Sequence, residues 1–322
     1  MIAMGSFVTR AVVQGIPLLY GSSGEILTEK SGHLNLGIPG IMYVGAMGGV
    51  VGAFFYETRT TNFNSAAAIA ITMGCSVIGA LLMGLIYCFL TITLRANQNV
   101  AGLSLTTFGV GFGNFMCGSL IKITKSEVPS ITATKTSAAF AKKLGEGKIP
   151  SVLSYSFLAY LAVILAIIMA IVLRKTRIGL HLRAVGENPA TADAAGINVN
   201  RYKYVATCIG SVIAGFGGLF YIMDYANGVW SNNGFGDRGW LAIALVIFAI
   251  WRPSLAIIGS ILFGGLYIIH YRFDGLSLAA QELFQMVPYA VTILVLILIS
   301  LRRKRETQPP AHLGLSYFRE ER

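Results

Sequence analysis

The sequence predicts an all-α protein, a polytopic bundle of transmembrane helices with about nine hydrophobic segments. Of its 322 residues, 55% are hydrophobic and only 12% are charged, whereas soluble domains average about 25% charged residues. Several uncharged apolar runs are as long as the ~20 residues that a helix needs to cross a bilayer. The basic residues lie between these runs and at the C-terminal end, as they do in membrane proteins.

The hydrophobic segments differ in length. The third has 30 residues, more than a ~30 Å bilayer core requires at ~1.5 Å rise per residue, so we expect it to tilt or to protrude. The seventh is too short to cross the core, so we expect it to be re-entrant or to extend into the preceding loop. The W-R-P sequence after it predicts a tight turn. The segments are residues 7–23, 41–56, 65–94, 100–121, 153–173, 202–225, 240–250, 254–270 and 281–301.

Glycines at helical spacing mark the second segment. Gly45 and Gly49 are four residues apart, and so are Gly48 and Gly52. Small residues at this spacing let helix backbones approach closely in a bilayer. The stretch 24–40 before them is polar and rich in glycine, and we expect it to separate the first two spans.

The distribution of basic residues predicts the topology. If the segments alternate, one set of loops lies on one side of the membrane and carries two strongly basic clusters, 174–183 and 302–305. The positive-inside rule makes that side the cytoplasm. The loop 122–150 on the other side carries six lysines, but the two clusters agree with each other and we follow them. We therefore expect the N-terminus outside and the C-terminus in the cytoplasm. The loops of the cytoplasmic set are 24–36, 95–98, 174–201, 251–253 and the tail from 302.

Residues 174–201 form the longest polar, basic segment between two strongly apolar runs. Asn188 is a good N-cap, and Pro189 fits the first helical position, where a missing N–H costs nothing. Alanines follow, which favour helix, and Gly196 suits a left-handed helix stop. We predict a helix of about two turns here, held in a basic cytoplasmic loop. An ordinary loop with one capped turn is the alternative.

Several classes of site are not indicated. The sequence has no Walker A pattern and no GxSxG or HExxH motif. The four histidines are far apart, and the four cysteines lie inside apolar runs without CxxC spacing, so we expect neither a metal site nor a disulfide framework. The net charge of +11 lies in loops and at the C-terminal end, so it indicates topology rather than nucleic-acid binding. We therefore expect no enzyme, no catalytic residues and no cofactor bound by this chain.

Neutral polar side chains cluster in or beside broken helices. Irregular backbone at membrane depth is tolerated where it is buried in protein or lines a wet cavity, so the cluster suggests a path for a neutral, hydrogen-bonding solute. Hydrogen bonding between helices, without any solute, is the alternative for each residue. Glu25 and Asp224 lie near the ends of spans, and we expect both to reach the interface. The candidate pathway residues are Asn35, Asn97, Gln98, Asn99, Ser104, Thr106 and Thr107.

Four stretches together resemble the permease subunits of ABC importers for nucleosides and simple sugars. The most specific is R-A-V-G-E-N-P-A-T-A-D-A-A-G (183–196), which is similar to the loop that such permeases insert into their ATPase partner. The other three are the S-G-H-L-N-L-G-I-P-G stretch within 24–40, residues 95–107, and residues 236–253. The branch that works with binding lipoproteins of the basic-membrane-protein type is the most similar.

This resemblance implies a transport subunit without its own ATP site, in a bacterial cytoplasmic (inner) membrane. It implies a permease domain over 1–305 and a cytoplasmic tail over 306–322. The implied partners are an ABC ATPase subunit that uses the ATP, a second permease chain that is a paralogue, an extracytoplasmic substrate-binding lipoprotein, and the lipid bilayer. The residues expected to couple to the ATPase are Arg183, Glu187, Asn188, Pro189, Ala190, Ala192, Asp193, Ala194 and Gly196.

Nucleosides are the cargo that this branch implies. Ribose-like sugars or another small polar solute are the first alternative. An ion-coupled secondary transporter would be expected to have inverted repeats and an acidic residue inside the membrane, and neither is clear in the sequence. An intramembrane enzyme would need a catalytic set that the sequence lacks.

Overall fold

The structure is a computed structural model that describes residues 4–123, 131–143, 154–269, 273, 277–302 and 308–318. These residues form helices joined by turns and irregular segments, and two isolated β-bridges join Thr132 to Val229 and Lys143 to Ser156. The all-α prediction is therefore confirmed. The helices are α1 (Met4–Glu29), α2 (Ile38–Arg59), α3 (Ser65–Cys88), α4 (Gln98–Ile123), α5 (Thr134–Phe140), α6 (Phe157–Lys175), α7 (Arg177–Glu187), α8 (Pro189–Ala194), α9 (Val199–Phe220), α10 (Arg238–Phe248), α11 (Pro253–Ile268), α12 (Leu278–Gln285) and α13 (Val287–Arg302).

The described part of the chain has six helical stretches that are long and apolar enough to cross a membrane. The prediction of about nine spanning segments is thus not confirmed. α10 and α11 are apolar but have only 11 and 16 residues, and 11 residues rise only about 16 Å. α1 has 26 residues, but Arg10, Gln14, Glu25 and Glu29 interrupt it. The six candidate spans are Ile38–Arg59, Ser65–Thr93, Gln98–Ser119, Phe157–Lys175, Val199–Tyr225 and Ala279–Leu298.

α2 is the most buried of these spans, and its glycines explain why. A Cβ on Gly45 would lie 2.6 Å from the Gly215 Cα of α9, and a Cβ on Gly48 would lie 2.6 Å from the Cys75 carbonyl oxygen of α3. Gly49 faces the Leu219 side chain of α9, and Gly52 faces the Cys75 side chain of α3. The two glycine pairs therefore serve two different neighbours, and the predicted close approach is confirmed.

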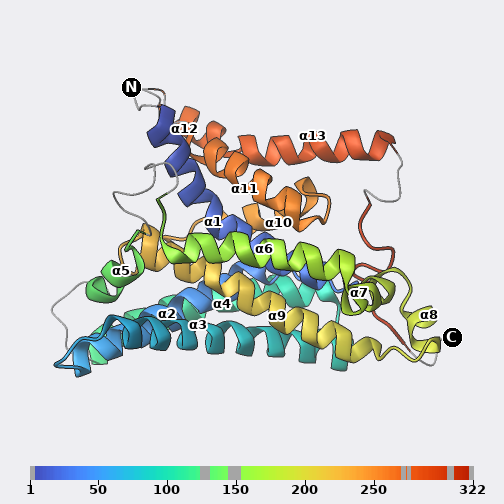
Figure 1. Cartoon of the computed structure of the whole chain (residues 1–322), viewed down its shortest axis with the longest axis horizontal. Helices are drawn as coiled ribbons and strands as arrows, with labels where there is room; N and C mark the ends of the chain where they lie inside the picture. The colour runs from blue at the N-terminus through green and yellow to red at the C-terminus, as the bar shows by residue number, and fades with distance from the viewer. Residues whose placement is uncertain are drawn as a thin grey trace.

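The predicted loop sets gather at opposite ends of the bundle. Gly186 of the 174–201 loop lies against Lys30 and Gly32, and the Gln98 side chain bonds to the Leu34 and Leu315 backbones. Figure 1 shows α7, α8 and the C-terminus together at this end, with α5 at the other end. At the far end the Gly228 carbonyl accepts from the Ala133 amide. The alternation of the loops is thus supported by their contacts.

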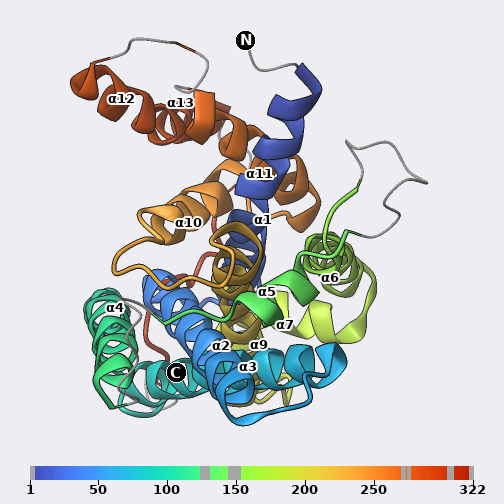
Figure 2. The same ribbon diagram turned by 90° about the vertical axis from the view of Figure 1, so that its left-hand side faces the viewer.

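Some elements differ from the sequence-based expectation. α1 continues to Glu29, so the irregular stretch is only 30–37 rather than the whole of 24–40. α5 is a short helix inside the loop 122–150, where the sequence shows little periodicity. The last segment divides at Met286 into α12 and α13, which lie at one side of the molecule, away from α3 and α9 (Figure 2). The tight turn predicted after α10 is present, with left-handed backbone at Ile250 and Trp251.

Candidate functional site

The loop between α6 and α9 contains two helices rather than one. α7 (Arg177–Glu187) was expected to be a basic loop, but it is an amphipathic helix. The Thr176 hydroxyl caps the helix by accepting from the Gly179 amide, and Leu182 and Val185 lie on the buried face of the helix. The available signal is the three-residue spacing of buried Leu182 and Val185, with Arg183 and Glu187 exposed, which is a helical pattern but a short one.

α8 forms as its sequence predicts. The Asn188 side chain accepts a hydrogen bond of 3.0 Å from the Thr191 amide, and Pro189 occupies the first turn. Gly196 has φ +81°, a left-handed conformation in which a residue without a Cβ is favoured. The helix is only six residues long, so its caps fix both of its ends.

α8 presents a face of small side chains to its surroundings. Pro189 and Ala192 are buried, and Ala192 packs with Val185 and Val199 in a small apolar cluster. Asp193 is partly exposed. Six of the predicted coupling residues are exposed, namely Arg183, Glu187, Asn188, Ala190, Ala194 and Gly196. A surface of alanine, glycine and asparagine offers close approach to another protein.

The described part of the C-terminal tail, residues 308–318, lies across α7 and α8; we call it the C-terminal strap. The His312 amide donates to the Gly186 carbonyl at 3.0 Å, at the end of α7. The Tyr317 hydroxyl donates to the Asp193 carboxylate of α8 at 2.9 Å. Arg95, just before α4, lies 4.7 Å from the centre of the Phe318 ring. The strap was expected only to be a polar tail.

The loop 30–37 lies beneath α7 and the strap. Gly32 has φ +77° and approaches the Gly186 Cα closely. Burial lowers the pKa of the Lys30 ammonium, and the nearby Glu187 carboxylate opposes this. The His33 ring is fully buried, with 2.7 Å contacts from its two nitrogens to the Thr207 and Thr91 hydroxyls. The loop therefore packs against α7 and is hydrogen-bonded to the spans.

Two buried acids lie at the end of α1 next to this loop, and one of them corrects an expectation. Glu25 is fully buried, so it does not reach the interface as expected, and its Oε1 accepts from the Asn35 amide at 2.9 Å. Glu29, one helical turn later, accepts from the Trp251 indole. Asp224 is partly exposed, in the π-helical turn Tyr221–Tyr225 that ends the α9 span. The i, i+4 spacing of Glu25 and Glu29 on an apolar helix was the available signal for this site.

The predicted pathway residues do not form one surface. Asn35, Gln98 and Thr106 are buried, and each bonds to backbone: Asn35 to Gly37, Gln98 to Leu34, and Thr106 to Leu36. Asn97 caps α4 by accepting from the Asn99 and Val100 amides. The residues of the set that α4 exposes are Asn99, Ser104 and Thr107.

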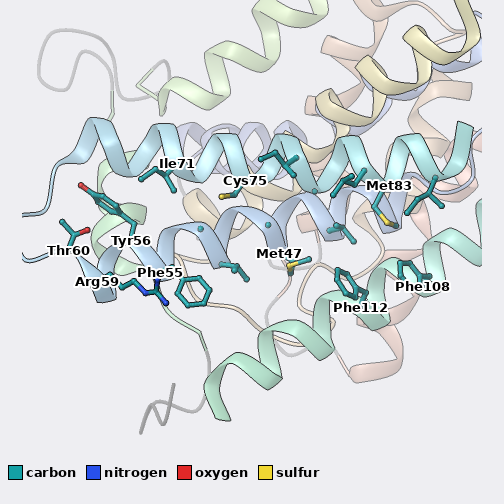
Figure 3. A pocket seen from close by; sticks show the side chains of 18 residues that line it. Met47, Phe55, Tyr56, Arg59, Thr60, Ile71, Cys75, Met83, Phe108 and Phe112 are labelled. Carbon is teal, nitrogen blue, oxygen red and sulfur yellow. The ribbon is translucent and has the colours of Figure 1, made fainter. Parts of the chain in front are cut away.

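A groove of about 730 Å³ runs between α2, α3 and α4. Figure 3 shows Phe108 and Phe112 of α4 on one wall, facing Met47 of α2. Its lining is mostly apolar, and Ser104 and Thr107 are not part of it. Among the described residues, no group of three His, Cys, Asp or Glu side chains could hold a metal ion.

The sequence is similar to known transport proteins along most of its length. The nucleoside ABC transporter permease protein NupC of Lactococcus lactis subsp. cremoris is 32% identical over 90% of this chain and 91% of its own. The guanosine ABC transporter permease protein NupQ of Bacillus subtilis is 29% identical over 90% of both chains. TsgC13 of Haloferax volcanii, provisionally named a glucose ABC transporter permease protein, is 30% identical over 94% of both chains.

A family model, described as the branched-chain amino acid transport system / permease component, matches residues 7–296. This range contains most of α1, all of α2 to α12, most of α13, the loop 30–37 and the whole α7–α8 segment. The chain therefore belongs to this family of transport permeases.

Proposed function

We propose that the chain is the membrane-spanning permease subunit of an ATP-driven ABC importer for nucleosides, and that a separate ATPase subunit binds the exposed face of α8. Residues 1–305 contribute the translocation path together with a second permease chain, and an extracytoplasmic lipoprotein delivers the cargo. The end that carries α7, α8 and the C-terminal strap faces the cytoplasm of a bacterial cell, because it carries the basic clusters.

One observation carries the proposal. α8 is a stiff, doubly capped helix whose exposed residues are small, and the residues around it connect it to the spans. α7 joins it to α6 through Thr176, and Asn198 joins it to α9 by accepting from the Arg201 amide. A partner that pushes α8 as a unit therefore moves the ends of α6 and α9. This is the geometry that coupling to an external motor requires.

Ala194→Arg tests the coupling. Ala194 is exposed on α8, so arginine is accommodated in the isolated permease but obstructs close approach by a partner. We expect ATP-dependent uptake into vesicles that contain all subunits to fall at least about tenfold, as the loss of ~1.4 kcal/mol or more of contact energy would give. Ala66→Arg, at an exposed alanine in the first turn of α3 at the other end, should transport normally. Unchanged uptake by Ala194→Arg would contradict the docking surface.

A sugar is the second candidate cargo, because TsgC13 matches as much of the chain as the nucleoside permeases do. Uptake of labelled guanosine and of labelled glucose, each in competition with unlabelled uridine, guanosine, ribose and glucose, distinguishes the two. We expect nucleosides to compete and free sugars not to. Competition by glucose or ribose alone would assign the chain to the sugar branch.

A further inference from the structure

The C-terminal strap touches two parts of the permease that are distant in sequence. At its start, the Ala311 amide lies 3.4 Å from a Glu187 carboxylate oxygen, and the His312 amide bonds to Gly186. At its end, Tyr317 bonds to Asp193. Between these contacts the Leu315 carbonyl accepts from the Gln98 side chain at 3.3 Å. One short segment thus bridges α7 and α8 to the first turn of α4.

Gln98 connects the strap to the loop 30–37 and to α3. Its other side-chain atom, Oε1, accepts from the Leu34 amide at 2.8 Å, and its backbone carbonyl accepts from the Tyr87 hydroxyl at 3.2 Å. Gln98 is itself buried. A displacement of the strap at Leu315 therefore reaches α4, the loop 30–37 and the end of α3 through one residue, Gln98.

α8 has few buried side chains that attach it to the rest of the permease. It buries only Pro189 and Ala192, and its apolar cluster consists of Val185, Ala192 and Val199 with a few partly buried neighbours, of which Tyr317 is one. Asn188, in extended backbone, and Gly196, in left-handed backbone, flank the helix, so both of its ends are non-helical points about which it can rotate. Without a second attachment, part of any push on α8 would be lost as rotation of this helix.

We propose that the C-terminal strap is a transmission element, and that Tyr317 is the positioning residue that ties the coupling helix α8 to it. Movement of α8 passes through the Asp193–Tyr317 contact to the strap, and from Leu315 through Gln98 to α4 and the loop 30–37. This inference rests on the proposed role of α8. It adds a second route to the spans, separate from the ends of α6 and α9.

Tyr317→Phe is the sharpest test, because it removes one hydroxyl and keeps the ring in its apolar cluster. We expect the number of ATP molecules hydrolysed per cargo molecule transported to rise about fivefold, the factor that loss of one hydrogen bond allows. Assembly with the ATPase and the melting temperature of the complex should stay at wild-type values. Tyr56→Phe is the matched control, because that hydroxyl bonds to the Asn64 backbone at the opposite end of the bundle; its ratio should not change.

A second variant, with the chain ending after Pro310, removes the bridging contacts together. It should raise the ratio of ATP hydrolysed to cargo transported at least as much as Tyr317→Phe does. If the truncated chain fails to assemble, the result for Tyr317→Phe alone tests the proposal. A wild-type ratio in Tyr317→Phe, alongside an uncoupled Ala194→Arg, would overturn the transmission role and leave the proposed function standing. A Tyr317→Phe complex that loses assembly and uptake together, at an unchanged ratio, would also overturn it, because the strap would then be only structural. Wild-type behaviour of Ala194→Arg together with a wild-type ratio in Tyr317→Phe would overturn both proposals.

Discussion

At the scale of single residues, the turn after α10 shows how one buried side chain holds a backbone that is otherwise unfavourable. Ile250 and Trp251 have φ of 53° and 50°, a region that β-branched and bulky residues avoid, at a cost of order 1–3 kcal/mol each. The Trp251 indole donates to buried Glu29. The hydrogen bond to a carboxylate offsets this strain, and it fixes the α10–α11 turn to the end of α1.

His312 makes the docking of the C-terminal strap sensitive to pH. Burial, with the nearby Lys203 charge, lowers the pKa of its imidazole below the usual ~6.5. The docked strap therefore binds fewer protons than the released strap, so docking is complete above pH ~6.5 and weakens as the pH falls through the lowered pKa. We expect hydrogen exchange of the amides of 312–318, corrected for its intrinsic pH dependence, to become faster between pH 7.5 and pH 5.5.

The control for this prediction is His312→Gln, which carries no titrating ring and keeps the backbone bond to Gly186. Its exchange should not respond to pH over the same interval. An equal response in His312→Gln and in the wild-type chain would show that another group is responsible.

At the scale of elements, close helix contact depends on glycines that have backbone directly opposite them. A methyl group on Gly45 would lie 2.6 Å from Gly215, whereas one on Gly74 of α3 would meet nothing within 4 Å. We expect Gly45→Ala to destabilise the protein by about 1–3 kcal/mol because α2 and α9 must separate. Gly74→Ala should be neutral or should stabilise by up to about 1 kcal/mol through helix propensity.

Melting temperatures of the two variants in the same detergent check this prediction. The comparison is matched because both substitutions add one methyl group to a membrane helix. A higher melting temperature for Gly45→Ala than for Gly74→Ala would mean that α2 and α9 are not in the contact described.

The α7–α8 pair shows what local sequence specifies about an element. Asn188, Pro189 and Gly196 lie within nine consecutive residues of the chain, so α8 was predictable from its own sequence. α7 was not predicted, because in an 11-residue stretch its buried positions are few and basic residues separate them. Its helical state depends on burial against α6 and the loop 30–32, because the spacing of Leu182 and Val185 is too short a pattern to specify a helix by itself.

At the scale of the whole molecule, the loops of the predicted cytoplasmic set converge on one end, and the connections between them are hydrogen bonds rather than chance proximity. Leu34, Gln98, Gly186 and the strap residue Leu315 belong to four of these loops and are joined in one network. An external motor acting at this end would reach several spans at once. An ion-coupled mechanism would not require such a surface.

We therefore expect uptake in vesicles with all partner subunits to require ATP and to continue when an ionophore collapses the ion gradients. Vesicles without the ATPase subunit are the control and should take up nothing above leak. Uptake that follows an imposed ion gradient in the absence of ATP would identify a secondary transporter instead.

Properties that depend on composition and on near neighbours in the chain could be predicted from the amino-acid sequence. These are the all-helical membrane fold, the Ser65–Thr93 span, the glycine contacts of α2, the cap-to-cap extent of α8 and the family resemblance that the comparisons confirm. The helices and caps depend on the bilayer or on contacts over a few residues, and the glycine spacing and the family motifs can be recognised directly in the sequence.

The roles of the polar residues became visible only in the three-dimensional structure. It divided the expected pathway residues into buried scaffold (Asn35, Gln98, Thr106), a helix cap (Asn97) and exposed positions on α4. It also showed Glu25 to be buried and the tail to be a strap. The reason is physical: the role of a polar side chain is set by the donor or acceptor that it meets, and for Gln98 those partners lie 64 and 217 residues away in the sequence.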